Sequence, residues 1–183
     1  DEVIVTIKEN AGTEKYDGTE KTVTGYTVTN ISNKLYAEKD FTFNGTAEVK
    51  GTDAGTYDME LKASDFANTN ADFSKVKFVI VDGTLTISKR EVTLTSATDS
   101  KEYDGTALTN DTVTVGGDGF VEGEGATYKV TGTQTNVGKS KNTFTYELNG
   151  NTKAINYTIT TAEGELEVTP VTDEVVVTIT ERS

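Results

Sequence analysis

The chain has 183 residues, a formal net charge of −13 and no Cys, His or Trp, and 35 of its residues are Thr. The absence of imidazole and thiol groups removes the commonest metal ligands and catalytic nucleophiles. The acidic balance excludes the basic surface that nucleic-acid binding requires. Because β-branched residues favour strands over helices, this composition predicts an all-β protein. Since His and Cys are missing, we also expect it to use no cofactor.

The first ninety residues alternate apolar and polar side chains, as half-buried strands do. Val3, Val5 and Ile7 share one face of the first segment. Further along, Asn44-Gly45 separates two strand-like segments, which predicts a type I′ hairpin because both residues tolerate positive φ. Asp82-Gly83 is expected to form the turn between the last two strands of this region, and these strands end a three-strand meander.

Residues 63–71 are the best candidate for a helix in this first region. They include Ser64-Asp65-Phe66-Ala67-Asn68. The segment is too short, and too rich in Asn and Asp, to carry a long helix. We therefore expect no more than a helical turn there.

The second half of the chain repeats the first. Lys15-Tyr16-Asp17-Gly18-Thr19 returns as Glu102-Tyr103-Asp104-Gly105-Thr106, and Asp82-Gly83-Thr84-Leu85-Thr86-Ile87 returns as Glu163-Gly164-Glu165-Leu166-Glu167-Val168. The opening residues 1–7 are echoed by residues 173–179. We predict a first β module at 1–90, a second at 91–170, and at 171–183 the first strand of a truncated third module.

The joints between these modules are short. Thr86-Ile87-Ser88-Lys89-Arg90 runs directly into the next strand-like segment, and Pro170 stiffens the second joint. Seven or so short strands in 80 to 90 residues favour a β-sandwich, and our fold prediction is two tandem antiparallel sandwiches of immunoglobulin-like type. A β-grasp module is the alternative, and it would require one real helix.

Several motifs together resemble a known family. Tyr-Asp-Gly-Thr stands near each module start, Val-x-Gly-Thr in the middle, and Gly-Thr-Leu-Thr-Ile or Gly-Glu-Leu-Glu-Val at the end. This order is similar to that of the YDG and MBG-type repeats of bacterial cell-surface proteins, and the likeness is closest in the second module. The resemblance implies an extracellular or wall-associated stalk or adhesin module without catalytic activity.

The Tyr-Asp-Gly motifs, Tyr16-Asp17-Gly18 and Tyr103-Asp104-Gly105, are interpreted as structural. Asp bonds to its own backbone and Gly supplies positive φ, so Asp-Gly forms a turn. We expect both Tyr rings to be buried at the module edge with their hydroxyls bonded to backbone. The alternative is a sugar-binding patch made of an exposed ring and the neighbouring carboxylate.

Two further patterns contain residue types that occur in functional sites. Asp118, Glu122 and Glu124 have the residue types of a carboxylate pair or a calcium loop, but they lie in a Gly-rich segment without calcium-loop spacing, which favours a solvated loop. Lys8 is the residue that could form a crosslink to an Asn. Since it alternates with the apolar face of the first strand, we expect it to point to solvent and to form no crosslink.

The predicted function is therefore a semi-rigid spacer whose partners are the neighbouring repeats of the same chain, with no nucleic-acid partner and no membrane insertion. One alternative is an adhesin module that binds an extracellular glycan or a host protein. Another is an accessory domain of a polysaccharide-degrading enzyme.

Overall fold

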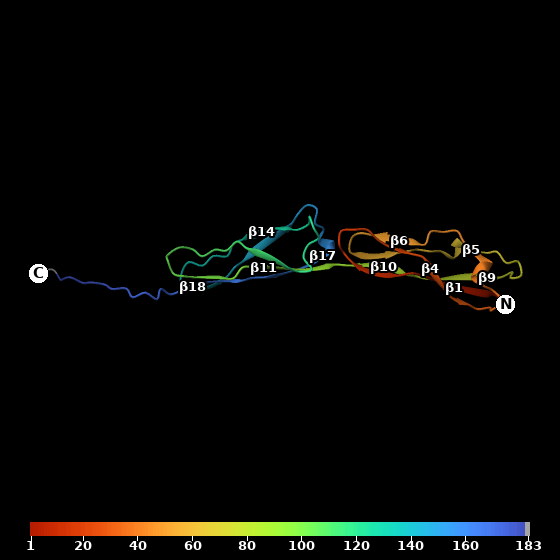
Figure 1. Ribbon diagram of the computed structural model, residues 1–183, viewed down its shortest axis with the longest axis horizontal. Coiled ribbons are helices and arrows are strands. Elements are labelled where there is room, and N and C mark those ends of the chain that lie inside the picture. The colour runs from red at the N-terminus through yellow and green to blue at the C-terminus, as the bar shows by residue number, and fades with distance from the viewer. Residues whose placement is uncertain (182–183) are drawn as a thin grey trace. The chain divides into compact units, whose positions relative to one another are not determined.

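The computed structural model describes residues 1–181, and residues 182 and 183 lie outside the described part. The chain divides into two compact units, which Figure 1 shows in red to yellow and in green to blue. Unit 1 holds Asp1–Arg90 together with the short segment Ile155–Tyr157, and unit 2 holds Glu91–Ala154 and the residues from Thr158 onward.

Unit 1 is built from short strands with two single 3-10 turns between them. The strands are β1 (Val3–Glu9), β2 (Gly12–Lys15), β3 (Lys21–Thr24), β4 (Tyr26–Ile31), β5 (Phe41–Phe43), β6 (Glu48–Gly51), β7 (Gly55–Asp58), β8 (Phe66–Asn68), β9 (Val76–Val81) and β10 (Thr84–Ser88). The 3-10 turns are η1 (Glu38–Asp40) and η2 (Ala63–Asp65).

Two three-stranded sheets organise unit 1. In the sheet β4-β1-β9, the first strand lies in the middle, antiparallel to β4 and parallel to β9. In the sheet β2-β10-β7, the last strand lies in the middle, parallel to β2 and antiparallel to β7. The start and the end of the unit therefore run side by side through both sheets, so each sheet is mixed and not purely antiparallel.

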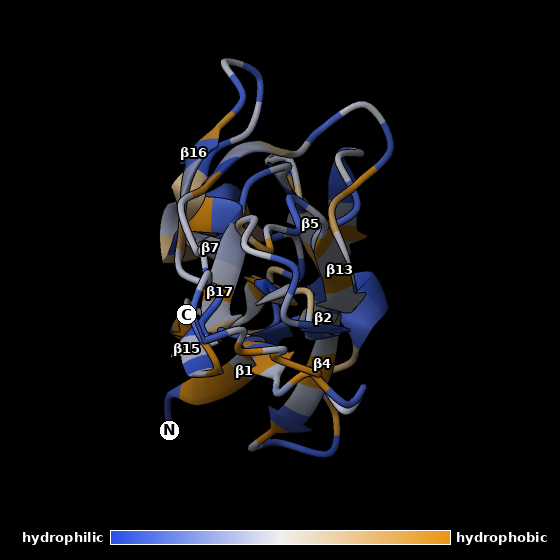
Figure 2. Ribbon diagram, turned by 90° about the vertical axis from the view of Figure 1, so that its left-hand side faces the viewer, coloured by the Kyte–Doolittle hydropathy of each residue, from blue (hydrophilic) through white to orange (hydrophobic). Residues whose placement is uncertain are grey.

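The core of unit 1 combines aliphatic strand faces with aromatic rings. Val3, Val5 and Ile7 are at most 1% exposed, as their alternation predicts, and β1 is orange in the hydropathy view of Figure 2. Burying each such side chain contributes about 1.5–3 kcal/mol. Five rings pack against one another mostly edge to face, namely Tyr26, Phe41, Phe43, Phe66 and Phe78.

Unit 2 repeats this plan. Its strands are β11 (Arg90–Ser96), β12 (Asp99–Glu102), β13 (Val113–Gly117), β14 (Ala126–Val130), β15 (Gly138–Lys141), β16 (Phe144–Leu148), β17 (Tyr157–Ala162) and β18 (Glu165–Thr169). The first residues of β11 and β17, and most of the 3-10 turn η3 (Ala154–Asn156), are counted with unit 1. The sheet orders β13-β11-β17 and β12-β18-β15 reproduce those of unit 1. The β18 strand is again parallel to the early strand β12 and antiparallel to β15.

The hairpin predicted at Asn44-Gly45 is wrong. The flanking strands pair elsewhere: β5 pairs with β8, and β6 pairs with β3. Phe43 lies opposite Phe66 with ring centroids 4.9 Å apart, and the Asn44 N–H donates to the Asp65 carbonyl. Aromatic packing between distant segments thus outweighs a local turn signal that is worth little by itself.

The meander predicted around Asp82-Gly83 is also wrong. The strands on either side, β9 and β10, do not pair with each other but belong to different sheets. Gly83 is the point where the chain passes from one sheet to the other, and a Cβ there would collide with the backbone of Glu9 and Asn10. Glycine is required at this position because of close backbone approach and not because of a hairpin turn.

The prediction of an all-β fold is confirmed, and the open sheets are consistent with a β-sandwich. Within residues 1–181 the helical segments are the three 3-10 turns, and residues 63–65 form one of them. None of them has the length or apolarity needed to cross a membrane. Residues 171–181, predicted as a strand, form none in this structure.

Candidate functional site

The Tyr-Asp-Gly-Thr motif of unit 1 forms a tight turn that Asp17 holds together. Its Oδ1 accepts the Thr19 N–H at 2.9 Å and the Thr19 hydroxyl at 2.6 Å. The Lys21 ammonium donates to the other carboxylate oxygen at 2.5 Å. Gly18 has φ 82°, the positive value that an Asp-Gly turn requires.

The motif of unit 2 builds the same turn with a lysine from elsewhere in the sequence. Asp104 accepts the Thr106 N–H at 2.9 Å and its hydroxyl at 2.7 Å, and Gly105 has φ 79°. Here the cation is Lys101, three residues before the Asp, whereas Lys21 follows its Asp by four. The repeats thus share an Asp, Thr and Lys cluster although the lysine does not occupy equivalent positions.

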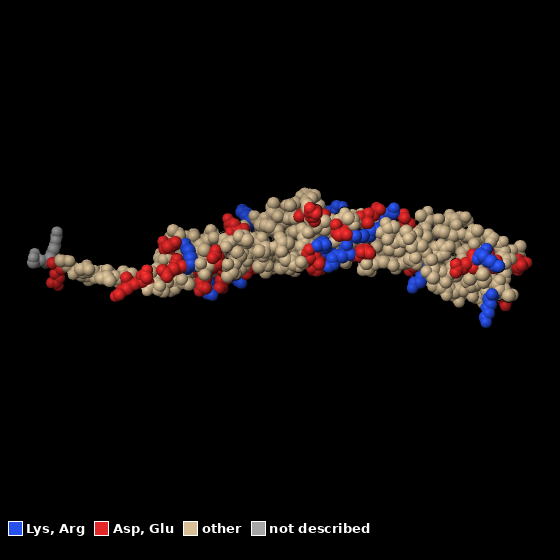
Figure 3. All heavy atoms as spheres, viewed as in Figure 1, with Lys and Arg blue, Asp and Glu red and all other residues tan. Residues whose placement is uncertain are grey.

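Both carboxyl groups are consequently more acidic than that of an ordinary Asp. The lysine, and after it the threonine hydroxyl and amide, hold the pKa of Asp17 and of Asp104 well below the usual range. The Lys and Thr groups that bond to each carboxylate favour its charged form, so the carboxylates are ill suited to proton transfer near neutral pH. On the face shown in Figure 3, Lys and Arg lie beside Asp and Glu and do not form a separate patch.

The two tyrosines of the motifs differ. Tyr16 is 4% exposed, and its ring meets that of Tyr157 edge to face with centroids 5.7 Å apart, both residues belonging to unit 1. Tyr103 is 41% exposed, so the prediction that it is buried is wrong. The physical reason is that Tyr103 lacks the ring contact that Tyr16 makes with Tyr157: among the described residues, no aromatic ring packs on Tyr103.

A buried polar cluster that the sequence analysis did not identify lies where β1 ends. The carboxyl oxygens of Glu9, which is 1% exposed, accept the Leu61 N–H at 2.6 Å and the Gly83 N–H at 2.8 Å. Glu9 continues the apolar face of Val3, Val5 and Ile7. A charged residue in phase with a buried face is the signal that could have identified it.

Unit 2 makes the corresponding contacts with shorter side chains. Ser96, at the end of β11, accepts the Gly164 N–H at 3.0 Å and donates to the Asn142 carbonyl at 2.5 Å. The Asn142 amide in turn donates to the carbonyls of Ala97 and Asn110, each at 2.9 Å. A Ser and Asn pair therefore replaces the single Glu, and in both units these side chains bond mainly to backbone.

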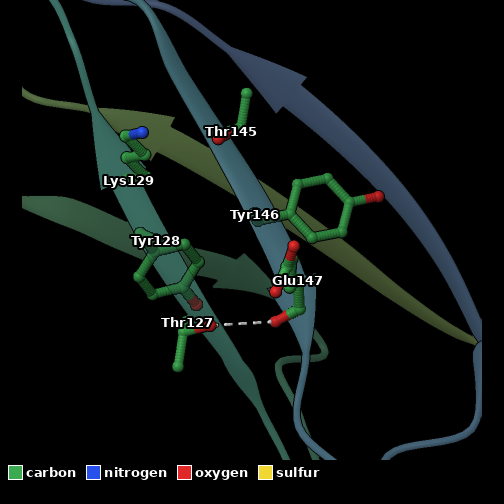
Figure 4. Close-up of a pocket in the computed structure, with 6 residues that line it drawn as sticks. All are labelled: Thr127, Tyr128, Lys129, Thr145, Tyr146 and Glu147. Carbon is green, nitrogen blue, oxygen red and sulfur yellow. Dashed lines mark hydrogen bonds between the residues drawn. The ribbon is translucent and has the colours of Figure 1, made fainter.

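A shallow hollow of about 180 Å³ lies on the β14–β16 pair of unit 2, and Figure 4 shows the side chains that line it. Tyr128 and Tyr146 stand at directly paired positions and are both half-buried. Burial raises the pKa of the Tyr128 hydroxyl. The other residues that line the hollow, Thr127, Lys129, Thr145 and Glu147, are exposed.

The acidic loop candidates do not converge. Glu122 is exposed, Asp118 uses a carboxylate oxygen to accept the Glu91 N–H at 2.9 Å, and Glu124 donates its N–H to the Val121 carbonyl. Within residues 1–181, no three Asp or Glu side chains gather in a group that could hold a metal ion. Lys8 is exposed, as its position in the alternation predicts.

These observations describe a repeat unit whose polar side chains mostly organise turns. Residues 3–89 match the family model of the MBG domain. The matched residues contain every strand from β1 to β10, so the match spans unit 1 apart from residues 1, 2, 90 and 155–157. Comparisons with curated proteins and with solved structures returned no match.

Proposed function

We propose that the chain is a non-catalytic, semi-rigid spacer segment of a bacterial surface or secreted protein, located outside the cell or on its wall. Three observations support this function. Residues 3–89 match the MBG domain model, unit 2 repeats the sheet order of unit 1, and the buried polar clusters around Glu9 and Ser96 bond to backbone. The partners of each repeat are then its neighbours in the same chain.

The observation that carries the proposal is the connection between β10 and β11. Lys89 is the single residue between the two strands. On one side of it the Ser88 carbonyl accepts the Tyr16 N–H at 2.9 Å, and on the other the Arg90 guanidinium donates to the Tyr16 carbonyl at 3.4 Å. Tyr16, Ser88 and Arg90 all belong to unit 1, so these bonds hold unit 1 together up to its last residue. A joint this short leaves little of the freedom that a flexible linker provides.

Small-angle scattering of the full chain tests this function. A compact globule of this length would have a radius of gyration of about 16 Å, and we expect a value at least ~5 Å larger. The matched control inserts Gly-Gly-Ser-Gly between Arg90 and Glu91, at the boundary of the two units, which should broaden the distance distribution while the Arg90 bond to Tyr16 is kept. A compact radius, or a distance distribution unaffected by the insertion, would contradict a semi-rigid spacer.

The hollow on β14–β16 favours glycan binding as a second candidate function. Half-buried tyrosine rings with a neighbouring lysine, glutamate and threonines offer both a stacking surface and hydrogen-bonding groups for a sugar. Titration with neutral oligosaccharides should then shift the NMR signals of Tyr128 and Tyr146. Tyr146→Ala should abolish the shift of the Tyr128 signals. Tyr103→Ala, which changes an exposed ring outside the hollow, should leave the shifts of both tyrosines intact.

A further inference from the structure

The slot that β1 occupies in unit 1 is bounded by a strand on each side. β1 is paired with β9 along Val3 to Lys8 and with β4 along Val5 to Glu9. Its inward face is at most 1% exposed. Any segment that took its place would therefore gain two hydrogen-bonded ladders and a row of apolar contacts.

Residues 173–181 repeat this strand closely. Asp173-Glu174-Val175-Val176-Val177-Thr178-Ile179-Thr180-Glu181 is identical to residues 1–9 at seven of nine positions. The two differences are Val176 in place of Ile4 and Thr180 in place of Lys8. Both Ile4, 38% exposed, and Lys8 face solvent in β1, so neither difference affects the buried face.

The match includes the buried acid. Glu181 stands at the position of Glu9, whose carboxyl oxygens accept the N–H groups of Leu61 and Gly83. Hydrophobic alternation alone would occur in many strands of a Thr-rich and Val-rich protein. The acid in register with three buried apolar residues makes residues 173–181 a specific fit for this slot.

In the structure, the apolar side chains of this segment have no cover. Val175, Val177 and Ile179 are 81%, 76% and 87% exposed, whereas their counterparts in β1 are buried. An extended segment with unpaired backbone and exposed apolar residues is a ready partner for an open strand position. We propose that residues 173–181 are a donor strand that fits the β4–β9 slot of unit 1 in a second copy of this chain.

The resident strand has the advantage in the unmodified chain. β1 is joined to β2 through two residues, which gives it a high effective concentration at its own slot. The donor strand of another molecule brings the same contacts without that advantage. Exchange should therefore become visible when β1 is impaired, and because donor and slot are different surfaces the resulting contact is head to tail and can propagate.

The test uses the full chain with Val5→Asp, which places a charge on the buried face of β1. We expect this variant to form concentration-dependent oligomers by light scattering while the aromatic near-ultraviolet signal of unit 1 is retained. Adding Val177→Asp, at the equivalent buried position of the donor, should abolish both properties. Adding Val176→Asp, whose side chain faces solvent, should preserve both.

The outcomes separate this proposal from its alternatives. A Val5→Asp chain that loses the signal of unit 1 regardless of the donor sequence would overturn it, and so would oligomers that persist with Val177→Asp. A folded monomer that depends on Val177 would place the donor strand in the same chain and overturn the assignment to a second copy.

Discussion

The Gly83 N–H donates to a carboxyl oxygen of Glu9, 74 residues earlier in the chain, at 2.8 Å. This bond joins the end of the first strand to the point where the last part of unit 1 changes sheets. The other carboxyl oxygen accepts the Leu61 N–H, so one side chain connects three segments. Glu9 is therefore a structural residue, although a buried acid is often taken for a catalytic one.

Replacing Glu9 should be strongly destabilising. Glu9→Ala leaves two buried N–H groups without acceptors, at a cost of about 1–3 kcal/mol each. Glu9→Gln keeps one oxygen acceptor and should lose about half as much. Urea denaturation of the full chain measures both, and the Lys8→Gln variant is the matched control because Lys8 is the exposed neighbour on the same strand. Equal stabilities of the alanine variant and the parent would contradict this role.

Much of the fold could be predicted from the sequence, because alternation reports directly on which face is buried. Val3, Val5 and Ile7 of β1 and Leu85 and Ile87 of β10 behave as their pattern indicates. The strand partners could not be predicted at Asn44-Gly45 and Asp82-Gly83. Turn residues describe local backbone preference, whereas pairing there is decided by Phe66 and Glu9, which are distant in sequence.

In the candidate sites, too, the local features could be predicted and the contacts with other segments could not. The Asp-Gly turns follow from local chemistry, since Asp17 and Asp104 bond to a threonine two residues later. Their lysine partners could not be predicted, because one follows the aspartate and the other precedes it. The exposure of Tyr103 was missed for a related reason: a repeated motif does not imply that each copy is covered by the same neighbour.

The unequal burial of the two motif tyrosines predicts unequal mutational effects. Tyr16→Ala removes a buried ring and its contact with Tyr157, and should cost about 3 kcal/mol or more. Tyr103→Ala changes a side chain that is 41% exposed and should cost about 1 kcal/mol or less. Thermal or urea unfolding of the two variants in parallel decides this. A larger loss for Tyr103→Ala would show that the second motif is covered in solution.

A glycine where the chain passes from β17 to β18 should not tolerate a side chain. A Cβ on Gly164 would collide with the carbonyls of Ala97 and Ser96. Because the obstacle is backbone, relief requires a strand to move, and Gly164→Ala should cost about 1–3 kcal/mol. Gly150→Ala is the control in the same unit, since a Cβ there meets nothing within 4 Å. Comparable stabilities of the two variants would refute this constraint.

The aspartate turns predict a loss of stability at acidic pH. The folded pKa of Asp17 and Asp104 lies below the unfolded value of about 3.9, so the unfolded chain binds more protons between the two values. The stabilisation is therefore fully present above about pH 5 and is lost as the pH falls toward the folded pKa. Asp17→Asn with Asp104→Asn should flatten the dependence of urea stability on pH below 4, whereas Asp72→Asn, outside both turns, should not.

Removing the C-terminal segment should leave both units intact. Residues 171–181 form no strand, and Val175, Val176, Val177 and Ile179 are all more than three-quarters exposed. Since their burial contributes nothing to the folded state, a chain ending at Thr172 should melt at nearly the same temperature as the parent. It should also remain monomeric when Val5→Asp is introduced, because the donor strand is gone. A large fall in melting temperature after the deletion alone would show that the segment packs against one of the units in solution.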